Sequence, residues 1–128
     1  MSEERARAQS ILEYLAGQRD AMVEMLVSLV EKESPTDVVA SQAAVQSQLS
    51  DALCELGFGV RHVPGRETGG HLFAVPEHRE RGKPAQLLIG HSDTVWPLGT
   101  LETMPVVVEN GHVRGPGTFD MKAGIVQG

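Results

Sequence analysis

The feature that most constrains this chain is a short apolar run that stops at a glycine and is followed at once by polar side chains. Residues 87–89 read Leu-Leu-Ile, and Gly90 leads into His-Ser-Asp at positions 91–93. A run that is apolar on both faces is typical of a strand buried inside a sheet. We therefore predict a buried strand over residues 86–89, with functional side chains at its carboxyl end.

The first part of the chain predicts an amphipathic helix. Between about residues 5 and 33, apolar side chains recur at helical spacing, and Gly17 marks a point where the helix can be interrupted. Pro35 stops the helix, because a residue that precedes proline avoids helical geometry. Met22 and Met25 lie on the apolar stripe, so we expect them to fill gaps in the core rather than bind a soft metal.

A second helix is predicted after the proline. We expect Thr36 or Asp37 to cap its start, since hydroxyl and carboxylate side chains accept hydrogen bonds from the first turn of a helix. Gly57 supplies the left-handed residue that ends it. Cys54 lies beside the apolar stripe, and we interpret it as a small packed hydrophobe. The stripe itself consists of Val45, Leu49, Leu53 and Leu56.

Short strands are predicted after the second helix. Residues 58–63 and 71–75 have the pattern of strands, and a turn-rich sequence joins them. Residues 106–109 and 112–114 flank the dipeptide Asn-Gly, which is the strongest short signal for a hairpin. Helices followed by short strands, one of them apolar on both faces, indicate an α/β layer architecture.

Charge and composition exclude several classes of function. The formal net charge is -6 over 128 residues and the basic residues form no stripe, so we predict that the chain binds no nucleic acid. The most apolar segment, residues 22–30, is too short to span a bilayer and contains Glu24, so no membrane role is expected. The one cysteine excludes an internal disulfide and the amino terminus is charged, which together predict a cytoplasmic protein.

The polar residues after the apolar run have the spacing of a metal ligand and a supporting carboxylate. In an extended segment, residues two apart point to the same side. Asp93 can therefore accept a hydrogen bond from one nitrogen of His91 while the other nitrogen binds a metal. The hairpin at residues 106–114 then brings Asp120, which follows the glycine-rich loop 115–117, back toward His91. These three residues form the candidate site.

Simpler structural interpretations of these residues stay open. His91 and Asp93 could be a hydrogen-bonded pair that closes a strand end, and Asp120 could cap a helix that starts near Met121. Lys122 is expected to be a solvated residue at that helix start. The histidines outside the motifs are expected at the surface or in turns: His62, His71, His78 and His112.

Taken together, the motifs resemble the M20 family of zinc metallopeptidases and amidohydrolases, and most of all its glutamate carboxypeptidase branch, that of carboxypeptidase G2. The family patterns are His-x-Asp-Thr-Val at residues 91–95 and Gly-x-Gly-x-x-Asp-Met-Lys at residues 115–122. Ser-Pro-Thr at 34–36 and Leu-Gly-Phe at 56–58 also match, so the resemblance extends over essentially the whole chain. Ala123 departs from the pattern, since the family often has a second glycine there.

The resemblance implies a role for each candidate residue. His91 would ligate one metal ion, Asp93 would be the catalytic-site carboxylate that orients His91, and Asp120 would bridge two metal ions. The cofactor would be Zn²⁺, two ions in a full-length site, with Co²⁺ or Mn²⁺ able to bind a similar set of ligands. The peptide bond between Asp120 and Met121 would be cis, as is characteristic of the family at this position.

The resemblance also implies a fold and a reaction. The chain would be the amino-terminal part of a three-layer αβα zinc-peptidase catalytic domain with a mixed sheet, incomplete by itself. The reaction would be hydrolysis of an amide or peptide bond next to a free carboxylate in a small peptide. The alternatives are deacylation of an N-acyl amino acid, of the acetylornithine or succinyl-diaminopimelate type, and a truncated, non-catalytic chain.

The same resemblance places other parts of such an enzyme beyond residue 128. The general base, the remaining metal ligands and a dimerisation domain would lie there, and a full-length counterpart could form a homodimer. A catalytic zinc ion normally has three protein ligands. We therefore expect the chain alone to be inactive.

Overall fold

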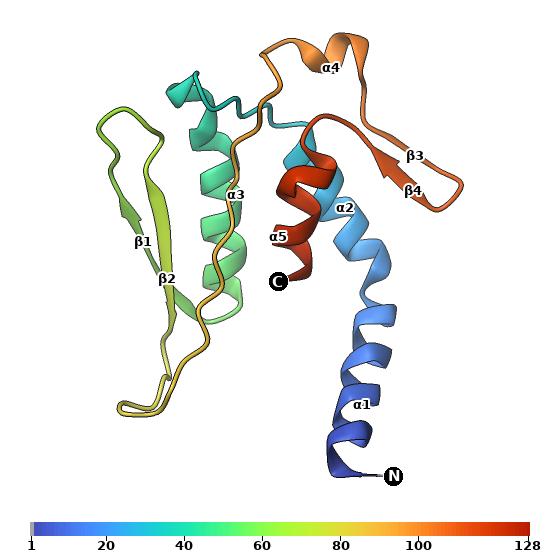
Figure 1. Ribbon diagram of the computed structural model, residues 1–128, viewed down its shortest axis with the longest axis vertical. Helices are drawn as coiled ribbons and strands as arrows, with labels where there is room; N and C mark the ends of the chain where they lie inside the picture. The colour runs from blue at the N-terminus through green and yellow to red at the C-terminus, as the bar shows by residue number, and fades with distance from the viewer. Residues whose placement is uncertain (1) are drawn as a thin grey trace.

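The first part of the chain is helical, in two helices rather than one. The computed structural model describes residues 2–128 and places α1 over Glu3–Gly17 and α2 over Arg19–Val30 (Figure 1). The break falls at Gln18, next to Gly17, which confirms the predicted interruption. Helix α1 extends away from the rest of the molecule with its side chains exposed, whereas α2 enters the core.

The second predicted helix forms, but its start differs from the prediction. A 3₁₀ turn over Val39–Ser41 precedes α3, Gln42–Glu55, and Gly57 follows the helix with a φ of 81°. The predicted caps at Thr36 and Asp37 are wrong, because the 3₁₀ turn separates both residues from the first turn of α3. The left-handed glycine after the helix is confirmed.

The predicted burial of Cys54 and Leu56 is also wrong. Cys54 is exposed, because it lies about 140° around α3 from Leu49, which points into the core. Leu56 is 75% exposed, because α3 ends one residue earlier and Leu56 no longer continues the helical stripe. Within the predicted stripe, Val45 and Leu49 are buried and Leu53 is half-buried.

The first predicted pair of strands forms a hairpin beside α3. Strands β1, Phe58–Val63, and β2, His71–Pro76, pair antiparallel with Val60 opposite Ala74. Figure 1 shows this hairpin alongside α3, which β1 contacts. Both strands match the prediction, and β2 is one residue longer than expected.

The second predicted hairpin forms as well. Strands β3, Val107–Glu109, and β4, His112–Arg114, are joined by Asn-Gly at 110–111, with φ values of 50° and 76°. Two successive residues of positive φ are what a tight hairpin turn requires. The hairpin returns the chain to Gly115, where an added Cβ would lie 2.9 Å from Cγ1 of Val30 at the end of α2.

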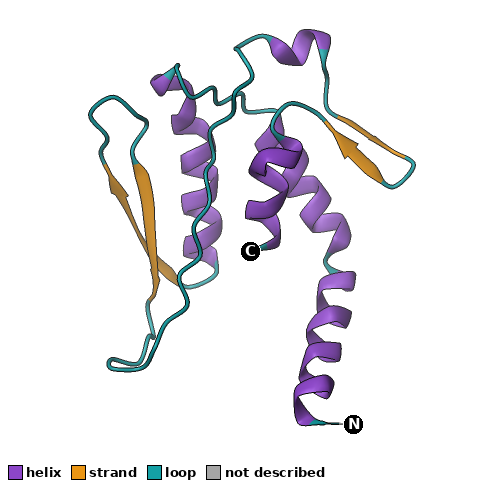
Figure 2. Cartoon of the chain, viewed as in Figure 1, coloured by secondary structure: helices purple, strands orange, loops and turns teal. Residues whose placement is uncertain are grey.

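The apolar run is the main departure from the prediction. Residues 87–89 form no strand in the part of the chain that the structure describes, and Figure 2 shows a loop between β2 and α4, Thr100–Thr103. The three side chains are 76%, 76% and 83% exposed. A strand needs a neighbour for its backbone hydrogen bonds and a cover for its apolar side chains. Residues 2–128 supply neither at this place.

The core lies where α2, α3 and α5, Ala123–Gln127, come together (Figure 1). Met25 packs there, as predicted. The buried cluster consists of Leu29, Val45 and Leu49, with Leu72, Ile125 and Val126 also packed against it. The described residues thus combine helices with two small antiparallel sheets, and the predicted mixed sheet is not among them. None of the helices in residues 2–128 is long and apolar enough to cross a membrane.

Candidate metal site

Two separate arms of the chain meet at the candidate site. The first arm, residues 91–94, continues from the apolar run, and the second arm, residues 115–122, contains the glycine-rich loop and the turn that carries Asp120. Gly117 lies at their contact with a φ of 72°, and a Cβ on it would lie 2.4 Å from Cγ2 of Thr94. Glycine alone takes this conformation readily and lets the two arms approach so closely.

The imidazole of His91 lies between two carboxylates. Its Nε2 is 2.9 Å from Oδ1 of Asp120 on the second arm. Its Nδ1 is 3.0 Å from the backbone oxygen of Asp93 and 3.3 Å from Oδ1 of the same residue. The structure thus brings the three candidate residues together, with Asp93 and Asp120 at opposite nitrogens of the ring.

A threonine outside the candidate set holds Asp93 in place. The Thr36 hydroxyl donates to Oδ2 of Asp93 at 2.7 Å, which leaves Oδ1 facing His91. The same hydroxyl oxygen is 3.1 Å from the carbonyl of Thr94, but a charged carboxylate is the stronger acceptor. Thr36 belongs to the Ser-Pro-Thr motif and is predicted from the sequence as a helix cap, and neither signal indicates its contact with Asp93.

The segment around Thr36 also binds the first arm through one further side-chain hydrogen bond and two backbone hydrogen bonds. The Ser34 hydroxyl donates to the carbonyl of Ser92 at 2.8 Å. The Thr94 amide donates to the Ser34 carbonyl, and the Thr36 amide donates to the Thr94 carbonyl, both at 2.9 Å. Pro35 and Thr94 thereby form a parallel bridge. These bonds hold the first arm against the turn that follows α2.

The charges around His91 favour its protonated form. Partial burial acts to lower the pKa of His91, but it is outweighed by the hydrogen bond with Asp120, the bond with the Asp93 carbonyl and the charges of both carboxylates. The pKa of His91 is therefore raised above its usual value. A metal ion at Nε2 must displace a proton, so metal binding is expected to weaken as the pH falls.

His91 and Asp120 fit part of a metal site. An imidazole nitrogen and a carboxylate oxygen both suit zinc, and two ligands of a tetrahedral zinc ion lie roughly 3.3 Å apart. Nε2 and Oδ1, which are 2.9 Å apart, would separate only slightly to share an ion. Asp93, at the far nitrogen, fits the role of an orienting partner. Within residues 2–128, no group of three or more His, Cys, Asp or Glu side chains is arranged to hold a metal ion by itself. The metal and orienting roles stay predictions.

Lys122 is buried, contrary to its prediction as a solvated residue. The residue is 1% exposed, and Nζ donates to the carbonyls of Leu29 and Lys32 at 2.9 Å each. Carbonyls at the end of a helix lack partners within it, so an ammonium group there satisfies them and complements the helix dipole. Burial lowers the pKa of Lys122 to about 8, while the charge of Glu33 opposes the shift and Lys32 adds to it.

Asp120 faces His91 rather than capping a helix. Its φ of -123° and ψ of 96° are not helical, and α5 starts at Ala123 with Lys122 at the cap position. The Asp120–Met121 peptide bond is cis, as the resemblance implies. The backbone N–H of His91 donates to Sδ of Met121 at 3.4 Å, which is a further contact between the two arms.

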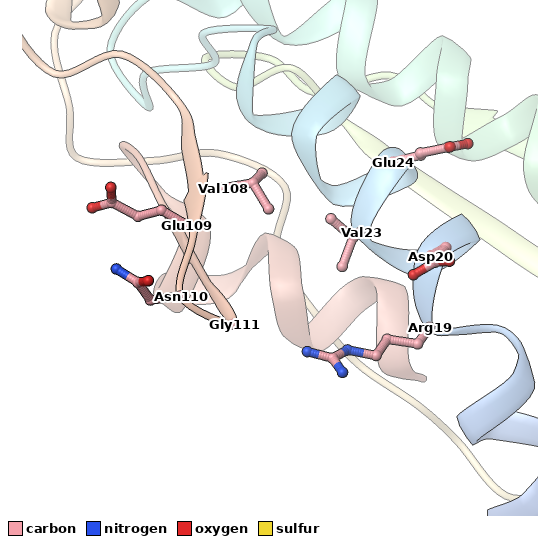
Figure 3. Close-up of a pocket in the computed structure, with 8 residues that line it drawn as sticks. All are labelled: Arg19, Asp20, Val23, Glu24, Val108, Glu109, Asn110 and Gly111. Atoms are coloured by element: carbon pink, nitrogen blue, oxygen red, sulfur yellow. The ribbon is translucent and has the colours of Figure 1, made fainter.

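Other candidate positions lie away from this site. A cleft opens between α2 and the β3–β4 hairpin, and Figure 3 shows Arg19 and Asp20 on one wall with Glu109 and Asn110 on the other. Its lining shares no residue with the candidate site in the described chain. The histidines outside the motifs are all exposed, as predicted: His62, His71, His78 and His112.

Comparison with known proteins identifies a similar carboxypeptidase. The chain is 33% identical over 109 residues to carboxypeptidase G2 from Pseudomonas sp. (strain RS-16). The alignment covers 84% of this chain and 26% of that protein, so the chain spans about a quarter of the length of this relative. No family model matches the chain. The chain is thus similar to a carboxypeptidase over most of its own length.

Proposed function

We propose that this chain supplies part of the metal site of a carboxypeptidase-type hydrolase, which cleaves an amide or peptide bond next to a free carboxylate. The observation that carries the proposal is the placement of His91 between Asp93 and Asp120, with one ring nitrogen toward each. The similarity to carboxypeptidase G2 over 84% of the chain supports the class of reaction.

Each residue has a distinct task in this proposal. Asp93 would accept a hydrogen bond from Nδ1 of His91 at its backbone carbonyl, and its carboxylate, held by Thr36, would lie beside the same nitrogen, so that Nε2 stays available as a ligand. Asp120 would offer Oδ1 beside that nitrogen, and its side chain is 74% exposed, so that Oδ2 remains accessible to a second ion. Zinc bound there would polarise the substrate carbonyl and lower the pKa of a water molecule.

The first test is zinc binding by the chain itself. We expect weak Zn²⁺ binding in calorimetric titrations, because His91 and Asp120 supply two protein ligands where a catalytic zinc ion normally has three. Asp120→Asn should lower the affinity by about tenfold or more, because it removes an anionic ligand. Asp51→Asn, which changes an exposed carboxylate on α3, is the matched control and should leave the affinity unchanged. Equal affinities of the Asp120→Asn variant and the wild type would overturn the proposed ligand.

The reaction is tested in a chimera in which this chain replaces the aligned segment of carboxypeptidase G2. The chimera is expected to hydrolyse a peptide that ends in glutamate, and Asp120→Asn is expected to abolish that activity. Preferential hydrolysis of an N-acetylated amino acid would favour the deacylase alternative. A folded, zinc-loaded chimera that cleaves neither substrate would contradict the proposed reaction.

A further inference from the structure

Both arms of the candidate site are attached to one short segment, residues 29–36, which comprises the end of α2 and the turn after it. Ser34 and Thr36 bind the first arm through their hydrogen bonds to residues 92–94. Lys122, on the second arm, donates to two carbonyls of the same segment. We call residues 29–36 the anchor segment, because it is the shared support of the two arms.

Lys122 makes two of these attachments from a buried position. The residue is 1% exposed, and its two hydrogen bonds to the anchor segment are both 2.9 Å long. Hydrogen bonds from a charged donor are roughly twice as strong as those between neutral groups. Lys122 follows Asp120 by two residues, so their Cα atoms are at most about 7 Å apart. A displacement of the lysine therefore moves the carboxylate with it.

We propose that Lys122 is a positioning residue, which sets the distance between Asp120 and His91 by fastening the second arm to the anchor segment. This inference rests on the proposed function, since the distance matters because the two residues are proposed to hold one ion. A carboxylate that is already held beside His91 loses less conformational freedom when it binds a metal. Without the attachment, the exposed side chain of Asp120 would spread over more positions and bind metal less tightly.

Lys32 offers a matched control for a lysine that only stabilises the fold. Its Nζ donates to the carbonyl and the hydroxyl of Ser28 at 2.9 Å each, at the same end of α2. Lys32→Met therefore removes an equal charge from the same helix end without detaching either arm. Lys122→Met removes the charge and the attachment together. A difference between the two variants isolates the positioning effect.

The experiment compares Lys122→Met and Lys32→Met in the full chain, under conditions in which urea unfolding shows each variant to be folded. The ring nitrogens of His91 are observed by NMR at one fixed pH, first without metal and then during a Zn²⁺ titration. Lys122→Met is expected to move the Nε2 resonance toward its position in the Asp120→Asn variant. It should also lower the Zn²⁺ affinity about tenfold, whereas Lys32→Met should leave the resonance in place and change the affinity less than about twofold.

Two results would overturn the inference: a Lys122→Met variant with the wild-type resonance and affinity, or a Lys32→Met variant with the same changes. Failure of the proposed function is seen separately, as a wild-type chain in which Zn²⁺ does not affect His91. In that case the Nε2 resonance of His91 without metal still tests whether Lys122 positions Asp120. If Lys122→Met does not fold, Lys122→Gln takes its place, because the polar glutamine side chain is one atom shorter than lysine and uncharged, so it removes the charge-assisted attachment while avoiding a fully apolar side chain. Wild-type behaviour of that variant would equally overturn the inference.

Discussion

The apolar run at residues 87–89 and the first arm at residues 91–94 are neighbours in the chain but differ in their contacts with the rest of the molecule. The apolar side chains are between 76% and 83% exposed. The first arm is bound by the anchor segment on one side and by the second arm on the other. Gly90 marks the boundary, since a Cβ on it would lie 3.4 Å from Cε of Met121. A segment is held in place and partly buried where other segments of the chain contact it, and the two arms of the site have such contacts whereas the side chains of the run are exposed.

The contacts that distinguish the first arm from the apolar run should be weakened most by Gly117→Ala, which would push the two arms apart. Alanine would have to adopt a φ of 72°, and its Cβ would lie 2.4 Å from Cγ2 of Thr94. We expect the free energy of unfolding to fall by about 2–3 kcal/mol. Gly82→Ala is the control, because Gly82 has a φ of 85° but nothing lies within 4 Å of an added Cβ. It should cost about 1 kcal/mol, and equal losses in urea unfolding would show that the contact between the arms contributes nothing.

A smaller effect is expected from Thr36→Val, which keeps the size of the side chain and removes the donor to Asp93. The free energy of unfolding should fall by about 1 kcal/mol, and the Zn²⁺ affinity about tenfold, because Asp93 would no longer be held toward His91. Thr36→Ser keeps the hydroxyl and should restore most of both. Urea unfolding and calorimetric titration measure the two quantities. Wild-type zinc affinity in the valine variant would show that this hydrogen bond does not organise the site.

Glu33 binds the segment that follows the first arm, and the strength of this contact depends on pH. Its carboxylate accepts hydrogen bonds from the backbone N–H groups of Gly99 and Leu101, at 2.8 Å and 3.0 Å. These bonds, above all the one from Gly99, hold the pKa of Glu33 below its ordinary value of 4.5. A carboxyl group with a lowered pKa in the folded state contributes stability above its unfolded pKa, and this contribution is lost as the pH falls through the folded pKa.

The stability of the chain should therefore decline as the pH falls below 4.5, and Glu33→Gln should flatten this decline. Urea unfolding between pH 3 and pH 7 measures it. Glu31→Gln, which changes an exposed carboxylate two residues earlier, is the control and should keep the wild-type slope. An unchanged slope in the Glu33→Gln variant would show that these hydrogen bonds do not stabilise the folded chain.

The smallest effect is expected in the apolar run. Leu88→Ser should change the free energy of unfolding by no more than about 0.5 kcal/mol, because Leu88 is 76% exposed. Leu49→Ala, in the buried cluster, should cost about 2–4 kcal/mol. A loss in Leu88→Ser as large as that of Leu49→Ala would show that the run is buried in solution and would remove the contrast with the first arm.

The sequence was sufficient for elements that depend on residues a few positions apart. The helix break beside Gly17 and the hairpin at residues 110–111 follow from local backbone preferences, and both were predicted. The arrangement of His91 and Asp93 is of the same kind, since the two residues are two positions apart. Asp120 came within reach of His91 because a predicted hairpin returns the chain.

Contacts between distant segments could not be predicted in this way. Lys122 was expected in solvent, because nothing near it in the chain reveals that carbonyls some ninety residues earlier need a donor. Thr36 is separated from Asp93 by 57 positions and was predicted to cap a helix. The prediction of a strand over residues 86–89 was wrong, because an apolar pattern shows only that a segment can be buried. It does not show whether other segments lie beside it.

A Zn²⁺ titration followed by NMR of the ring nitrogens of all five histidines tests most directly whether His91 and Asp120 form a metal site. We predict that Nε2 of His91 responds first and that Nδ1 keeps its proton, because Asp93 lies at that nitrogen. Asp120→Asn should remove this response at the same Zn²⁺ concentration. A first response at another histidine, or coordination through Nδ1 of His91, would contradict the proposed site.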